Sequence, residues 1–129
     1  MAQRRPLIAG NWKMFGRLAD LEEIAALEAA IGTAANVDVA ICPPLSLLYP
    51  ARRRFMASAI AFGAQDVAAG PDAAKTGDVN AAMLADIGAH FVIVGHSERR
   101  AGHAETDQIV LAKAAALGFT LAVFAYVLP

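Results

Sequence analysis

Short apolar runs alternate along this chain with longer stretches in which apolar residues recur at helical spacing. The short runs predict buried strands at residues 7–9, 37–42, 60–64, 91–94 and 119–123. The longer stretches predict helices at residues 21–31, 45–56, 80–87 and 105–117. A strand and a helix recurring roughly every 25 to 30 residues are typical of βαβ units, so we expect an α/β protein with a parallel sheet.

Two local signals refine the predicted helices. Asp20 and Glu23 have the spacing of a capping box that opens the first helix. Behind it, one apolar stripe is formed by Leu21, Ile24, Leu27 and Ile31. In the second helix we expect a kink or break near Pro50, because proline lacks a backbone N–H.

Polar side chains gather just after the ends of the predicted strands. They are Asn11, Lys13, Gln65, Asp66, His96 and Glu98. In parallel α/β sheets and barrels the carboxyl ends of the strands share one edge, and that edge carries the chemistry. These six residues are therefore the candidates for a functional site.

His96 is the most informative of these candidates. It lies at the tip of the run 91–94, and Ser97 after it is predicted to be the N-cap of a helix, with Glu98 in the first turn. The unpaired N–H groups and positive dipole end of a helix disfavour a protonated ring. His96 would then be a neutral imidazole able to polarise a substrate as an electrophile.

The composition excludes several classes of protein. An apolar content of 57% excludes a disordered chain, and 11 basic against 12 acidic residues give no reason to expect nucleic-acid or membrane-surface binding. The lone Cys42 lies in an apolar run and is expected to be a buried small hydrophobe in a cytoplasmic protein. No Cys or His spacing typical of a metal site is present, so a metal is not expected. The N-terminus has no apolar stretch of signal-peptide type.

Several strings of residues point to one family. They are residues 9–14 (AGNWKM), 42–44 (CPP), 63–66 (GAQD), 76–78 (TGD) and 92–100 (VIVGHSERR). In this order and spacing they resemble the triosephosphate isomerase family, from about Pro6 to Gly118. The resemblance implies a (β/α)8 barrel that interconverts dihydroxyacetone phosphate and glyceraldehyde 3-phosphate without a cofactor, in glycolysis and gluconeogenesis.

The resemblance also implies roles for single residues. Asn11 and Lys13 would contact the substrate, and Lys13 would also stabilise negative charge near the enediolate. His96 would be the neutral electrophile, as the histidine of this enzyme is known to be. Glu98 would support the lysine. The alternatives without a catalytic role are a solvated lysine, a structural histidine and a carboxylate that serves only the helix dipole.

A homodimer is implied in the full-length context. The expected contacts with the second subunit are Met14, Gln65, Thr76 and Gly77. The loop 65–78 is long for a connection in such a fold, which favours a functional loop over an ordinary surface loop. Arg99 and Arg100 are expected in salt bridges at the short helix and at the interface.

The resemblance covers only about the first four βα units and a fifth strand. We therefore expect residues 1–118 to be the N-terminal half of a barrel, and 119–129 to begin the fifth strand and continue as an atypical tail. The family's glutamate base, lid and main phosphate loops have no counterpart here, so the isolated chain should be nearly inactive. The alternative is a non-catalytic half-barrel, either a truncated gene product or a designed folding unit, that self-associates. A phosphate-binding module is a weaker third hypothesis.

Overall fold

The computed structural model describes residues 4–32, 36–118 and 121–125. Its strands are β1 (Leu7–Asn11), β2 (Asp38–Cys42), β3 (Ala61–Ala64), β4 (Phe91–Val94) and β5 (Ala122–Ala125). Its helices are the 3-10 turn η1 (Leu18–Asp20), α1 (Leu21–Ile31), α2 (Leu45–Arg54), α3 (Ala81–Asp86), α4 (Ser97–Gly102) and α5 (Asp107–Leu117). None of the helices in this described part is long and apolar enough to cross a membrane.

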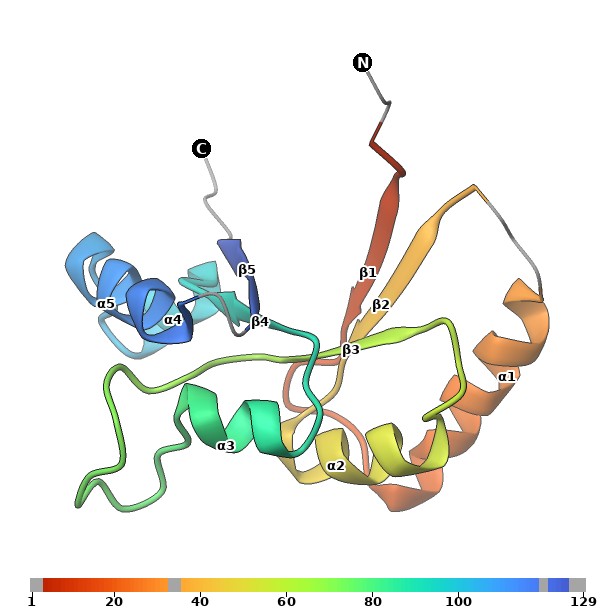
Figure 1. Ribbon diagram of the computed structural model, residues 1–129, viewed down its shortest axis with the longest axis horizontal. Coiled ribbons are helices and arrows are strands. Elements are labelled where there is room, and N and C mark those ends of the chain that lie inside the picture. Colours follow the sequence, from red (N-terminus) through yellow and green to blue (C-terminus); the bar gives the residue numbers. More distant parts are fainter. Residues whose placement is uncertain (1–3, 33–35, 119–120, 126–129) are drawn as a thin grey trace.

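The strands form one five-stranded sheet in chain order, β1-β2-β3-β4-β5. Every neighbouring pair is parallel, so each connection must cross back along the sheet. Figure 1 shows α1, α2, α3 and α5 following the sheet in an arc along one side. The predicted α/β class is confirmed, and the arrangement is that of a half-barrel.

The two faces of the sheet carry different cores. On the helix side, Ile41, Phe62 and Val92 belong to one large buried cluster with residues of the helices, such as Ile24 and Leu48. On the opposite side, a small cluster consists of Ala40, Cys42 and Phe91. Gly63 permits this second cluster, because a Cβ built there would lie 2.2 Å from Cε2 of the Phe91 ring. Burial on the helix side therefore dominates the stability of the described sheet.

β1 is much less covered than the other strands. Leu7 is 41% exposed and Ile8 is 60% exposed, although successive residues of a strand point to opposite faces. Within the described residues β1 lies at the end of the sheet and pairs with β2 alone. Both of its faces and one edge are therefore open.

The predicted capping box of α1 is wrong. The carboxylate of Asp20 accepts a hydrogen bond from the backbone N–H of Arg17 at 2.7 Å, and makes no cap bond to α1. The reason is that η1 leads directly into α1, which leaves Asp20 already helical at φ −75°, ψ −6°. A capping residue needs an extended backbone to turn its side chain onto the helix. The predicted stripe is buried at Leu21 and Ile24, whereas Leu27 is 37% exposed.

The break predicted near Pro50 does not occur, since α2 continues through this residue to Arg54. Proline removes one helical hydrogen bond, and the burial of Leu47, Leu48 and Ala51 holds the helix against the sheet. At the other end of the chain, β5 begins at Ala122. Residues 119–120 and 126–129 lie outside the described residues, so the boundary at residue 118 and the atypical tail remain predictions.

Candidate functional site

The candidate residues come together at the carboxyl ends of the strands. Asn11 ends β1, Gln65 follows β3, and His96 and Glu98 follow β4. Together with Lys13 they line one cavity of about 340 Å³. Its other lining residues are Met14, Pro44, Leu45, Arg99 and His103. Asp66 is absent from this lining and belongs to an ion network described below.

Lys13 has a strained backbone. Its φ is +57°, in the left-handed region, which costs a non-glycine residue on the order of 1 to 3 kcal/mol. Its N–H donates to Oδ1 of Asn11 at 2.8 Å, and its carbonyl accepts from Nε2 of Gln65 at 2.9 Å. These two bonds hold the turn in a conformation that lysine would otherwise leave.

The strained turn directs the Lys13 side chain to Glu98. The ammonium Nζ donates to Oε1 of Glu98 at 2.6 Å, and both side chains are about half exposed, at 50% and 55%. This hydrogen bond, together with the positive charge of Lys13, lowers the pKa of Glu98. Glu98 is therefore a carboxylate that fixes a cation at the mouth of the cavity.

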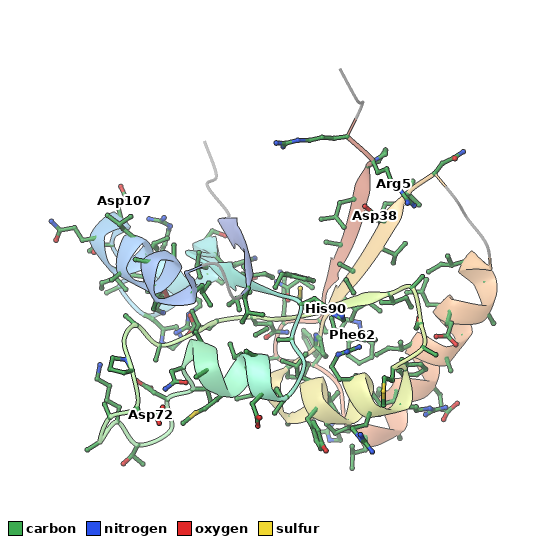
Figure 2. All side chains as sticks on the ribbon, viewed as in Figure 1. Arg5, Asp38, Phe62, Asp72, His90 and Asp107 are labelled. Carbon is green, nitrogen blue, oxygen red and sulfur yellow. The ribbon has the colours of Figure 1, made fainter. Side chains whose placement is uncertain are left out.

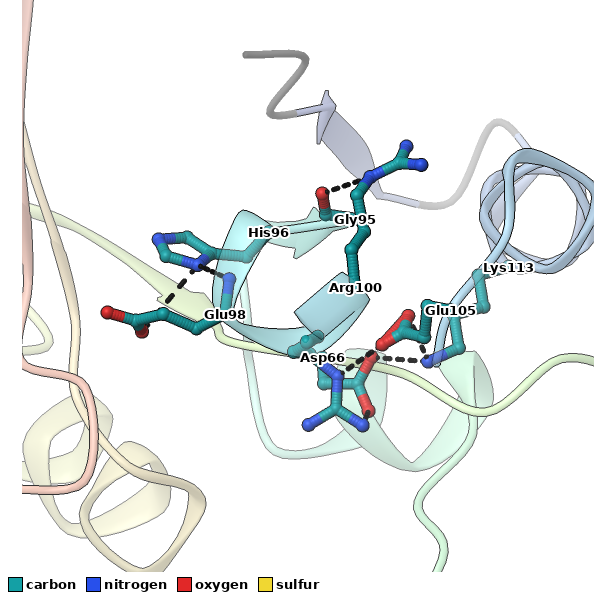
Figure 3. Close-up of polar contacts among 8 residues, drawn as sticks. Asp66, Gly95, His96, Glu98, Arg100, Glu105 and Lys113 are labelled. Atoms are coloured by element: carbon teal, nitrogen blue, oxygen red, sulfur yellow. Dashed lines mark hydrogen bonds and ion pairs between the residues drawn. The ribbon is translucent and has the colours of Figure 1, made fainter. Parts of the chain in front are cut away.

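His96 is the N-cap of α4, and the prediction that Ser97 takes this place is wrong. Nδ1 of His96 accepts a hydrogen bond from the backbone N–H of Glu98 at 3.1 Å, and Ser97 is the first helical residue (Figure 3). Oε2 of Glu98 lies 3.6 Å from the same nitrogen. Because Nδ1 accepts, the neutral ring carries its proton on Nε2. The ring is thereby set in the tautomer that can donate to a carbonyl oxygen.

A network of ion pairs connects α4 to neighbouring segments (Figure 3). Arg99 binds Asp66 at 3.0 Å and Glu105 at 2.7 Å, and Lys113 binds the same two carboxylates at 2.8 and 2.9 Å. Burial would raise the pKa of Glu105, but the hydrogen bond and charge of Lys113, together with Arg99, lower it overall. The network joins the segment after β3 to α4 and α5, so ion pairs hold the helix that follows His96 in place.

Glu105 and Lys113 were missed as supporting residues by the sequence reasoning. A signal was present in the sequence, because Lys113 is a single charge within the apolar run 109–117. In the structure this lysine is only 8% exposed. The predicted salt bridges of the two arginines are confirmed within the chain, since Arg100 binds Asp107 at 2.6 Å and Arg99 belongs to the network. A role of either arginine at an interface stays a prediction.

The residues expected at a subunit interface lie in two different settings. Met14 is 93% exposed and lines the candidate cavity. Thr76 and Gly77 are exposed in the loop between β3 and α3. Gln65 is instead bonded within the chain, to the carbonyls of Lys13 and Cys42. Contact with a second subunit remains a prediction for all four.

Cys42 is buried, as predicted, with 1% of its surface exposed. Burial raises the pKa of its thiol to about 12. The thiol is therefore protonated at neutral pH and unreactive. The backbone carbonyl of Cys42 helps to hold the site together. It accepts hydrogen bonds from the backbone N–H of Trp12 at 3.0 Å and from Nε2 of Gln65 at 2.8 Å.

Comparisons with known proteins agree on one family. The sequence profile of triosephosphate isomerase matches residues 6–121. The chain is 54% identical over 113 residues to the triosephosphate isomerase of Afipia carboxidovorans, covering 87% of this chain and 45% of that protein. It is 51% identical over 114 residues to that of Rhizobium etli, covering 87% and 44%. The chain thus spans less than half the length of these curated relatives.

A solved structure shows the same similarity in three dimensions. The crystal structure of triosephosphate isomerase from Bartonella henselae superimposes with a TM-score of 0.90 at 39% sequence identity. The match covers 96% of this chain and 52% of that one.

Proposed function

Because this chain belongs to the triosephosphate isomerase family, we propose that its residues form the electrophilic part of an active site that interconverts dihydroxyacetone phosphate and glyceraldehyde 3-phosphate. The observation that carries the proposal is the double role of Glu98. Its backbone N–H fixes the ring of His96, and its carboxylate holds the ammonium of Lys13. One residue thus sets both groups beside the same cavity.

The chemistry of isomerisation suits these two groups. Removing a proton from the carbon beside a carbonyl places negative charge on the carbonyl oxygen. The Nε2–H of a neutral His96 would donate to that oxygen, and the Lys13 ammonium would stabilise the enediolate charge. Asn11 would touch the substrate while its Oδ1 holds the turn of Lys13. Neither a metal nor a cofactor is needed for this scheme.

The base that takes the carbon-bound proton is expected from a segment corresponding to the part of the relatives that this chain does not match. The phosphate grip is expected from the same part. We further propose a cytoplasmic homodimer, with Met14, Gln65, Thr76 and Gly77 contacting the second subunit. The open faces of β1 favour a second hypothesis for the chain alone, a non-catalytic half-barrel that self-associates.

Turnover tests the proposal. The chain is assayed with glyceraldehyde 3-phosphate alone, and again with a polypeptide that supplies the remaining length of the Afipia relative. We expect almost no turnover alone and measurable turnover in the mixture. His96→Asn should lower that turnover by roughly 10² to 10⁴, since asparagine can still cap α4 but has no imidazole. Equal turnover in the mixtures with and without this substitution would contradict the proposed site.

A further inference from the structure

Gln65 connects two strands of the sheet to the turn that carries Lys13. Its Nε2 lies 2.9 Å from the carbonyl oxygen of Lys13 and 2.8 Å from that of Cys42. Both partners are acceptors, so the amide nitrogen must face them and each of its two hydrogens has a partner. The side chain therefore joins residues that follow β1 and β3 to the last residue of β2.

The position of this bond matters because Lys13 is left-handed, at φ +57°. The Asn11 contact on the Lys13 N–H comes from two residues away and would move with the turn. The Gln65 contact comes from 52 residues away, on a neighbouring part of the sheet. It anchors the carbonyl of Lys13 itself to the neighbouring strands, whereas the bond from the Trp12 N–H to the Cys42 carbonyl anchors only the residue before it.

We propose that Gln65 is a positioning residue for Lys13, which keeps the turn in the left-handed conformation that brings the ammonium to Glu98. The proposal rests on the function proposed above for Lys13. It gives Gln65 a task within one chain, separate from any contact with a second subunit. The direction of the Lys13 side chain depends on this amide.

The donor requirement makes the proposal specific. Methionine has a similar length and no donor, so Gln65→Met removes both bonds while filling most of the space. Gln65→Glu is nearly isosteric and places a carboxylate against two carbonyl oxygens, so it should also release the turn.

The adjacent Asp66 supplies a matched control. It binds Arg99 at 3.0 Å and Lys113 at 2.8 Å and has no contact with Lys13 among those described. Asp66→Asn therefore weakens the same segment without touching the proposed anchor.

The readout is the pKa of the Glu98 carboxyl group, titrated by NMR in the 129-residue chain. All variants are made in the Ile8→Lys background, because Ile8 is exposed on the open strand β1 and its replacement should limit self-association. The hydrogen bond from Lys13 is the largest cause of the lowered pKa of Glu98, so Lys13→Met defines complete loss of the contact. We expect Gln65→Met to recover more than half of the rise seen in Lys13→Met, and Asp66→Asn to leave the pKa unchanged. An unchanged pKa in Gln65→Met, or an equal rise in Asp66→Asn, would overturn the proposal.

The scalar couplings that report φ of Lys13 give a second measurement. In Gln65→Met and in Gln65→Glu these couplings should no longer indicate a left-handed φ for Lys13. They are the main measurement for Gln65→Glu, because its new charge complicates the titration of Glu98. Unfolding of both Gln65 variants while Asp66→Asn folds would also overturn the proposal, because it would assign Gln65 a general structural role. Neither measurement involves turnover. The role of Gln65 can therefore be confirmed or refuted separately from the proposed catalytic function.

Discussion

The backbone N–H of Glu98 donates a hydrogen bond to Nδ1 of His96 across 3.1 Å. This contact caps α4 and sets the tautomer of the imidazole at the same time. The carboxylate of the same Glu98 holds Lys13. The contact between His96 and Glu98 thus both caps α4 and orients the imidazole of the site.

The capping role of His96 predicts a stability difference between two substitutions. His96→Ala removes the acceptor of the Glu98 N–H and should lower the free energy of unfolding by about 0.5 to 2 kcal/mol. His96→Asn keeps an acceptor in a residue that caps helices well, so it should be close to wild type. Urea unfolding of the three chains measures this, and equal losses in both variants would show that the cap contributes nothing.

His90 predicts a loss of stability in acid. Its Nδ1 accepts from the backbone N–H of Phe62 at 2.9 Å (Figure 2), and burial together with the charge of Arg52 lowers its pKa from 6.5. A lowered pKa in the folded state means that the unfolded state binds the proton more tightly. The contribution of neutral His90 to the free energy of unfolding is therefore present above the pKa of an unfolded histidine, about 6.5. It is lost as the pH falls below that value.

The check on His90 is urea unfolding at several values between about pH 7 and pH 5. His90→Leu should remove part of the acid destabilisation in this range. His103→Leu should retain it, because His103 is exposed like His90 but its ring accepts no hydrogen bond among the described contacts. The same pH dependence in wild type and His90→Leu would contradict this role.

Features that follow from a run of apolar residues could be predicted from the sequence, whereas features that depend on the direction of a single side chain could not. The strand at residues 91–94 was predicted with its observed bounds, because both its faces are buried and its residues are uniformly apolar. The cap of α4 could not be predicted, since it depends on the direction in which the His96 ring turns.

Two further features of the site could not be predicted, because they too depend on the conformation of single residues. Nothing in the composition shows that Lys13 is left-handed, or that Gln65 reaches its carbonyl from 52 residues away. The gathering of polar residues at one sheet edge was predictable, because all parallel strands end at that edge. The bonds that fix those residues were not.

Gly63 predicts a packing constraint on the inner face of the sheet. Gly63→Ala would place a Cβ 2.2 Å from the ring of Phe91, and overpacking of this kind should lower the free energy of unfolding by about 1 to 3 kcal/mol. Gly10→Ala is the control, since no atom lies within 4 Å of its added Cβ. The double variant Gly63→Ala with Phe91→Leu should recover part of the loss. Equal unfolding midpoints for wild type and Gly63→Ala would refute the constraint.

The open faces of β1 predict self-association of the 129-residue chain. Ile8 is 60% exposed beside a strand edge that is unpaired within the described residues, and apolar edges of this kind pair with other chains. Light scattering at micromolar concentration should show particles larger than 13.4 kDa. Ile8→Lys should reduce them, whereas Leu111→Lys on α5, also at an exposed position, should not. A uniform monomer of the unchanged chain would contradict this prediction.

The most direct test of the account is a double-mutant cycle on Lys13 and His96 in the complemented turnover assay. Each of Lys13→Met and His96→Asn alone should lower turnover strongly, because in the proposed site Glu98 sets both groups beside the same cavity. Residues that act as a unit are not additive, so the double variant should be little slower than the slower single variant. Losses that multiply in the double variant, or single variants as active as the unchanged chain, would contradict the account.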